Sequence, residues 1–249
     1  MIKINCDIGE REPDNPVDLA LMEHIRIANI ACGGHAGNAE TVAVFRALAE
    51  KYHVGVSAHL SYPDKVNFGR VSMDMAVDEL IASLDEQIAL IPNADMVKFH
   101  GGLYHDSCNR PMLARDLALW LKRKNIETLI APHGSEIHKA CDNKGIQVLC
   151  EAFAERRYQY NPDTQSLGLM DRKHDISSIH DCKEALRQCL TIIRYGFVEA
   201  YVENQQGGWD KRKMTLPCQT VCIHSDSPIA LELVEALGKT IRNERGMHD

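Results

Sequence analysis

The chain has 249 residues, of which 45% are hydrophobic and 25% charged, and its formal net charge is −7 at pH 7. These values are typical of a globular protein, and an acidic balance argues against a nucleic-acid-binding surface. The sequence has no run of 18 apolar residues and no charged leader before an apolar segment, which predicts a cytoplasmic protein without a membrane span.

Short apolar segments of strand length alternate along the chain with amphipathic segments of helical period. Strands are expected over residues 2–8, 26–31, 54–58, 95–99, 127–132, 146–150, 198–203 and 219–223. Helices are expected over residues 17–24, 38–51, 77–91, 113–121, 135–145, 181–196 and 228–241, with Asn38 at the start of the second. Residues 159–180 and 204–217 are predicted to be loops.

Seven or eight repeats of strand, loop and helix, without a change in composition, predict a parallel sheet with crossover helices. We therefore expect an α/β fold in one domain over residues 1–249. At this length a closed (β/α) barrel of seven or eight mostly parallel strands is favoured, and an open doubly wound sheet is the alternative. In both folds ligands bind at the carboxyl ends of the strands.

Polar side chains gather where the predicted strands end. Asp7 lies within an apolar run, where an unpaired charge is costly, so we interpret it as a catalytic base rather than a turn residue. Lys98 ends another apolar strand and needs an anionic partner, unless its side chain reaches solvent. His133 also follows a strand, but we expect it to be an ordinary turn residue. The other polar residues near strand ends include Glu10, Asn29, His35, His59, Arg70, His100, Tyr104, Glu151, Glu155, Arg156, His224 and Asp226.

This set of side chains suits general acid–base chemistry on a small polar or anionic substrate. The sequence has no phosphate-binding loop, no dinucleotide-binding glycine motif and no Gly-x-Ser-x-Gly motif. Its nine cysteines include no Cys-x-x-Cys pair, which argues against a zinc ribbon. Histidines with a carboxylate also suit a divalent metal, for which Asp7, His35 and His59 are candidates.

Six motifs resemble the LamB/YcsF family, the A subunit of bacterial 5-oxoprolinase. They are NCDIGE (5–10), NIACGGHAG (29–37), AHLSYPD (58–64) with FGR (68–70), VKFHGGLY (97–104), EAFAER (151–156) and CIHSD (222–226). The motifs occur in order over nearly the whole chain. The resemblance implies a deformed β/α barrel similar to polysaccharide deacetylases. It also implies ATP-dependent opening of 5-oxoproline to L-glutamate together with partner subunits B and C, with ATP handled through those partners.

On this resemblance we assign site roles. Asp7 is expected to deprotonate the attacking water, while Lys98 and His100 stabilise the developing charge. The residues expected to bind the lactam substrate are Glu10, Asn29, His35, His59, Arg70, Tyr104, Glu155, Arg156 and Asp226.

The chain departs from the family pattern at several positions, namely Gly34, Asn38, Leu60, Phe99, Gly102, His105, Glu155 and Ser225. Two other functions remain open from the sequence. One is a metal-dependent amidohydrolase or deacetylase that acts alone, and the other is a non-catalytic subunit that binds a small molecule.

Overall fold

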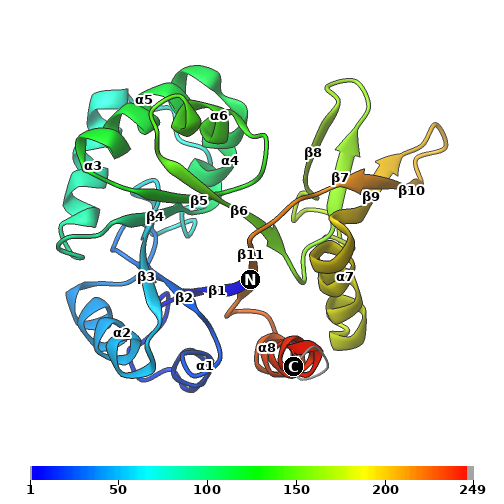
Figure 1. Cartoon of the computed structure of the whole chain (residues 1–249). Coiled ribbons are helices and arrows are strands. Elements are labelled where there is room, and N and C mark those ends of the chain that lie inside the picture. Colours follow the sequence, from blue (N-terminus) through cyan, green and yellow to red (C-terminus); the bar gives the residue numbers. More distant parts are fainter. Residues whose placement is uncertain (1, 246–249) are drawn as a thin grey trace.

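The computed structural model describes residues 2–245, with side chains for residues 2–241. Seven parallel strands form a closed barrel in the order β1-β11-β6-β5-β4-β3-β2 (Figure 1). The strands are β1 (Lys3–Ile8), β2 (Ile27–Ala31), β3 (Gly55–Leu60), β4 (Met96–Phe99), β5 (Thr128–Ala131), β6 (Gln147–Phe153) and β11 (Thr220–His224). The predicted barrel is therefore confirmed, and the open doubly wound sheet is wrong.

The barrel strands are buried on both faces because helices cover their outer side. Every residue of β2 is buried, and so are the last five residues of β1. The strand register also aligns polar positions. Asp7 on β1 lies opposite Asn29 on β2 and His224 on β11, and His59 on β3 lies opposite Lys98 on β4. Polar residues that are distant in the sequence thus become neighbours at one level of the barrel.

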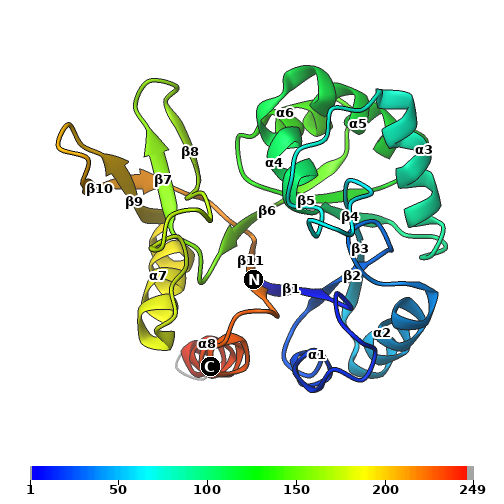
Figure 2. The same ribbon diagram turned by 180° about the vertical axis from the view of Figure 1, so that it is seen from behind.

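Helices surround the barrel, as the two opposite views show (Figures 1 and 2). They are α1 (Pro16–Leu21), α2 (Ala39–Tyr52), α3 (Val77–Ile88), α4 (Gly101–Asn109), α5 (Pro111–Arg123), α6 (Glu136–Asp142), α7 (Cys182–Tyr195) and α8 (Ala230–Arg245). Asn38 caps α2 as expected, because its side chain accepts from Thr41 N–H while the Thr41 hydroxyl accepts from Asn38 N–H. Among residues 2–245, no helix combines the length and apolar character needed to cross a bilayer.

A second sheet of four strands projects from the barrel beside α7 (Figure 1). Its order is β10 (Trp209–Thr215), β9 (Phe197–Glu203), β7 (Tyr158–Asn161) and β8 (Ser166–Leu169). The prediction that residues 159–180 and 204–217 are loops is therefore wrong where β7, β8 and β10 lie. The strand predicted at 198–203 exists, but it belongs to this sheet, which is why the barrel has seven strands. A small apolar cluster that includes Tyr158, Ile192 and Val198 joins the sheet to α7.

Candidate active site

The carboxyl ends of the barrel strands bring the predicted polar residues together. Lys98 on β4 is the central cation of this group, and its side chain is only 2% exposed. Its Nζ lies 3.0 Å from Asp7 Oδ1 and 3.1 Å from Glu151 Oε2. The alternative that Lys98 reaches solvent is therefore wrong. Burial favours the neutral amine, but the charge of Asp7, with Cys222 and Glu151, raises the pKa of Lys98 well above its ordinary value.

Asp7 is held as a carboxylate by donors on three neighbouring strands. Its Oδ1 accepts from Asn29 Nδ2 at 2.8 Å and from Lys98 Nζ, and its Oδ2 lies 3.4 Å from His59 Nε2. Burial alone would raise the pKa of Asp7, but the positive charges of His59 and Lys98 hold it well below the usual range. A buried, ionised and oriented carboxylate is thus present where the sequence predicted a catalytic base.

Three imidazoles and the Glu10 carboxylate form a second, adjoining cluster. The rings of His35 and His100 stack with centroids 3.8 Å apart, and His59 meets both rings edge-on. Glu10 Oε1 lies 3.0 Å from His35 Nε2, 3.5 Å from His100 Nδ1 and 3.7 Å from His59 Nε2. We call Glu10, His35, His59 and His100 the imidazole cluster.

The charges inside the imidazole cluster follow from burial and crowding. Burial, and then the neighbouring imidazoles, hold the pKa of His35 and of His100 well below the ordinary value, so both rings are neutral. Burial and the charge of Asp7 raise the pKa of Glu10. Asp7 and Glu10 are thus two nearby carboxyl groups whose pKa values are pushed in opposite directions, which is a pattern found at acid–base sites.

The hydrogen-bond partners of His59 assign its protons. His100 Nε2 lies 3.1 Å from the Phe68 carbonyl oxygen, so His100 donates from Nε2 and accepts at Nδ1. His59 Nε2 lies 3.0 Å from that Nδ1, and His59 Nδ1 lies 3.2 Å from the Lys98 carbonyl oxygen. Both nitrogens of His59 therefore face acceptors, so this network places each of them to donate a hydrogen bond.

The imidazole cluster also has the donor set of a divalent metal site. Its four ligand atoms all lie within 4.8 Å of one another. Neighbouring ligand atoms of the cluster lie 3.0–3.7 Å apart. A tetrahedral site with Zn–N and Zn–O bonds of about 2.0–2.1 Å separates its ligand atoms by roughly 3.3 Å, which lies within this range. The metal candidates predicted from sequence were Asp7, His35 and His59. The geometry replaces Asp7 by Glu10 and adds His100, and Asp7 groups with Cys222 and His224 instead. Metal binding itself stays a prediction.

The remaining predicted binding residues lie around these clusters. Arg70 and Asp226 are paired at 3.0 Å and are 41% and 46% exposed, so they lie on the rim. Glu155 hydrogen-bonds the ring of His224 and accepts from its backbone N–H at 3.1 Å. The hydroxyl of Tyr104 is buried, and burial with the charge of Glu151 raises its pKa well above the ordinary value.

Arg156 is directed toward the backbone of the segment that follows it. Its Nη2 donates to the Met170 carbonyl at 2.7 Å and its Nε to the Ser177 carbonyl at 3.3 Å. These bonds hold the loop over residues 170–177 against the barrel. A role for Arg156 in binding a substrate carboxylate stays a prediction.

Two residues to which the sequence assigned no catalytic or binding role support the centre of the site. Asn5 is fully buried, and its Oδ1 accepts from Asn29 Nδ2 at 2.8 Å and lies 3.4 Å from Lys98 Nζ. Glu151 forms the second ion pair of Lys98. Alternate residues of a strand share a face, so the two-residue spacing of Asn5 and Asp7 was the signal that could have identified Asn5.

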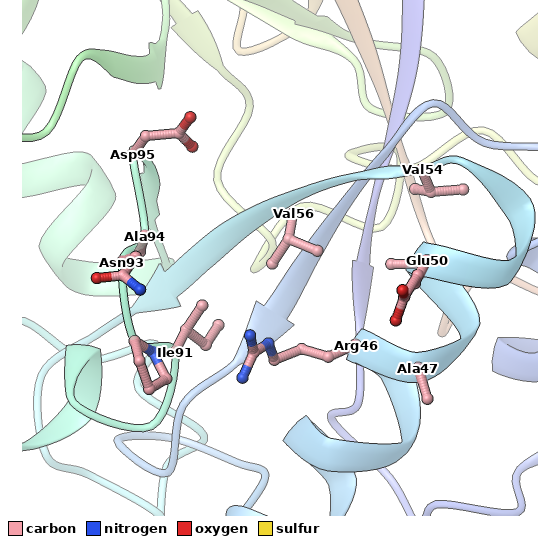
Figure 3. A pocket seen from close by; sticks show the side chains of 11 residues that line it. Arg46, Ala47, Glu50, Val54, Val56, Ile91, Asn93, Ala94 and Asp95 are labelled. Carbon is pink, nitrogen blue, oxygen red and sulfur yellow. The ribbon is translucent and has the colours of Figure 1, made fainter.

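A separate hollow of about 490 Å³ lies at the opposite ends of the strands (Figure 3). Arg46 and Glu50 of α2 line it on one side, and residues 91–95, just before β4, line it on the other. The lining also includes Val54, just before β3, and Val56 near the start of that strand. None of its lining residues belongs to the predicted site, so it plays no part in the function proposed below.

Comparisons with known proteins agree with one another. The model of the LamB/YcsF family matches residues 2–248. An A subunit of 5-oxoprolinase from Pseudomonas syringae pv. tomato is 31% identical over 252 residues, covering 96% of this chain and 93% of that protein. The A subunit of 5-oxoprolinase from Paracidovorax citrulli is 30% identical, covering 98% and 96%. The crystal structure of the lactam utilization protein from Thermus thermophilus superposes with a TM-score of 0.79 at 28% identity, covering 98% and 96%.

Proposed function

The chain belongs to the LamB/YcsF family, and from this membership we propose that it is the A subunit of an ATP-dependent 5-oxoprolinase. The reaction is the hydrolysis of the lactam of 5-oxoproline to L-glutamate in a cytoplasmic complex with partner subunits B and C. The names of the relatives support the family-level function. The observation that carries the catalytic part of the proposal is the buried Asp7 carboxylate, which Lys98 and Asn29 hold at the barrel mouth.

A five-membered lactam is a weak electrophile, so the carbonyl must be activated before water can attack it. Transfer of the γ-phosphoryl group of ATP to the lactam oxygen gives an activated imidate and ADP. Water then adds to the carbon, and cleavage of the ring C–N bond in the resulting intermediate gives the free amine and a γ-glutamyl phosphate. A second water releases the phosphate from this acyl phosphate and leaves L-glutamate. This chain has no phosphate-binding loop, which fits ATP being held through the partner subunits.

The two carboxyl groups suit two different proton transfers. Asp7 stays ionised and, in this proposal, orients the water and takes up its proton as the C–O bond forms. Glu10, whose pKa is raised, is protonated more readily than Asp7, and in this proposal it delivers a proton to the departing ring nitrogen. Lys98 and His100 lie beside Asp7 and Glu10, where a positive charge and an imidazole stabilise the developing oxyanion.

The decisive experiment measures glutamate and ADP formed from 5-oxoproline and ATP, with this chain alone and with subunits B and C. We expect coupled formation of both products only when all three subunits are present. Omission of this chain should abolish glutamate formation. If the complete complex binds 5-oxoproline without turnover, the chain is instead a non-catalytic binding subunit.

A second candidate function is that of a metal-dependent amidohydrolase acting alone, which the imidazole cluster favours. Its four residues would hold the ion, and a divalent metal there would supply a Lewis acid and a water of lowered pKa. The two candidates place opposite demands on His59. A metal needs a lone pair at Nε2, whereas the hydrogen-bond network described above needs a proton there.

Elemental analysis of the purified chain, followed by an amidase assay without ATP, separates the two candidates. A divalent ion bound at the imidazole cluster together with ATP-independent amide hydrolysis would support the amidohydrolase. A protein that holds no metal at the imidazole cluster and turns over 5-oxoproline only with ATP and both partners would support the proposed role in the complex. The variant His59→Gln gives a second readout, since it should lower metal content only if the metal site exists.

A further inference from the structure

Three potential metal ligands meet on the outer side of the barrel, away from the clusters described above. His133 follows β5, His138 lies on α6, and Cys150 lies on β6 opposite the last residue of β5. Helix α6 packs on both strands (Figure 1). Neighbouring residues of a strand point to opposite faces. Because Glu151 contacts Lys98 inside the barrel, Cys150 faces outward, toward α6.

The spacing of these side chains matches a metal-binding geometry. Cys150 Sγ lies 3.7 Å from His133 Nδ1 and 3.9 Å from His138 Nδ1, and all three ligand atoms lie within 4.8 Å of one another. A tetrahedral ion with a Zn–S bond of about 2.3 Å and a Zn–N bond of about 2.0 Å separates sulfur from nitrogen by roughly 3.5 Å. The two sulfur–nitrogen distances therefore exceed the tetrahedral value by only a few tenths of an ångström.

His138 is already oriented as a ligand. Its Nε2 lies 3.4 Å from Asp142 Oδ2, one turn later on α6, and its Nδ1 accepts from Gly134 N–H at 2.8 Å. The proton therefore belongs on Nε2 and the lone pair on Nδ1, which faces Cys150. A carboxylate behind a histidine is the usual support of a histidine ligand in metal sites. A bound ion would replace Gly134 N–H as the partner of Nδ1. Gly134 lies in an exposed turn, so water can then accept from its N–H.

We propose that His133, His138 and Cys150 bind Zn²⁺, or a transition-metal ion of similar preference, at a second site outside the barrel. Two neutral imidazoles and a thiolate are the ligands that such ions prefer over Mg²⁺ or Ca²⁺. Cys150 loses its thiol proton to solvent when the ion binds. His133 is exposed, so water can occupy the fourth position. The sequence interpretation of His133 as an ordinary turn residue is revised by this proposal, which is independent of the proposed function.

Titration of the metal-free full chain with Co²⁺ tests the site by a signal specific to its thiolate. Cobalt bound by cysteine gives a near-ultraviolet charge-transfer band, which the imidazole cluster, having no cysteine, cannot produce. We expect the band to appear at about one equivalent and to disappear when Zn²⁺ is added. Cys150→Ser should abolish it, and Asp142→Asn should weaken binding by at least about tenfold.

Matched controls separate ligand loss from a general loss of structure. His133→Gln changes an exposed side chain and should weaken Co²⁺ binding without unfolding the chain, whereas His105→Gln, also exposed, should leave it unchanged. Cys108→Ser is the corresponding control for the thiol. The proposal is overturned if the wild type gives no thiolate band. It is also overturned if the band survives His133→Gln at full affinity, or if it is lost on Cys222→Ser but not on Cys150→Ser.

Discussion

Lys98 and Asp7 form an ion pair across the barrel that is almost closed to solvent, with Nζ 3.0 Å from Oδ1 and side chains 2% and 5% exposed. Taking two charges out of water is costly, so such a pair persists only where hydrogen bonds satisfy both partners. Asn29 does this for Asp7, and Glu151 adds a second carboxylate for Lys98. The pair therefore links function to stability at the centre of the site.

Asp7→Asn should abolish most of the ring-opening activity of the complete complex. The amide keeps the shape of the side chain but cannot take up a proton, and the loss of a general base lowers a rate by about 10²–10⁴-fold. The measurement is kcat for glutamate formation with ATP and both partner subunits. Asp78→Asn, on the exposed side of α3, is the control and should retain full activity. Unchanged turnover by Asp7→Asn would remove Asp7 from the mechanism.

Lys98→Met should destabilise the chain at neutral pH and reverse the pH dependence at this site. In the wild type, the lowered pKa of Asp7 gives a contribution that is present above about pH 4 and is lost only as the pH falls through the folded-state pKa. In the variant, both carboxylates lose the charge of Lys98 and stay buried, so the pKa of Asp7 rises and stability improves as the pH falls.

We expect Lys98→Met to lower the free energy of unfolding by about 3–5 kcal/mol at pH 7.5, with partial recovery at pH 5.5. Urea denaturation at the two pH values measures this. Lys122→Met, an exposed position on α5, should show neither the loss nor the recovery. A variant that is equally stable at both pH values would contradict the assignment of the buried charges.

The sequence was sufficient for the barrel strands because each is an apolar run that helices cover. It was insufficient for β10, where four consecutive residues are exposed and pairing with β9, rather than burial, forms the strand. Helix α4 was also missed, since it begins with Gly101 and Gly102 and lacks a regular apolar period. Where backbone pairing or tertiary contacts replace hydrophobic patterning, the sequence carries little local signal.

The sequence predicted the site as a set of residue types at strand ends, and parallel strands explain why these residues meet at one end of the barrel. The individual contacts between them could not be predicted. Nothing in the sequence indicates that Glu10, rather than Asp7, joins the three histidines, since that depends on how the turn after β1 is folded. Arg156 likewise looked like a ligand for an anion, but its guanidinium binds two backbone carbonyls.

The His224–Glu155 pair should make stability depend on pH near neutrality. Burial alone would lower the pKa of His224, but Glu155 raises it above the ordinary value. A raised pKa stabilises the fold fully below about pH 6.5, and this contribution is lost as the pH rises through the folded-state pKa. Glu155→Gln should lower the pKa of His224, measured by NMR titration. It should also weaken the dependence of the free energy of unfolding on pH near neutrality. Glu136→Gln, on the outer helix α6, should leave both unchanged.

Asp85 joins α3 to α5 through the indole of Trp120. Asp85 Oδ1 accepts from Trp120 Nε1 at 2.7 Å and from Lys124 Nζ at 2.9 Å. Asp85→Ala leaves a buried indole N–H without this acceptor, so the free energy of unfolding should fall by about 1–3 kcal/mol. Lys124→Ala removes only the half-exposed ion pair and should cost about 1 kcal/mol or less. Equal losses for the two variants would show that the indole bond is not the important contact.

Gly101 is the position where one added methyl group should disturb the fold and the site together. Its φ is +55°, and a Cβ there would lie 2.3 Å from the backbone oxygen of Gly69. Gly69 in turn packs against the side chains of His35 and His100. Gly101→Ala should therefore displace the loop over residues 64–70 and loosen the imidazole cluster.

Gly145 is the matched control, because its φ of +67° is similar but a Cβ there meets nothing within 4 Å. Gly145→Ala should cost about 1–2 kcal/mol from backbone strain alone. Gly101→Ala should cost roughly a further 1–3 kcal/mol, because its Cβ overlaps the backbone oxygen of Gly69. It should also lower the turnover of the complete complex, whereas Gly145→Ala should leave turnover unchanged. Since both substitutions force alanine into the same backbone region, equal losses of stability would mean that the contact between residues 69 and 101 is not tightly packed.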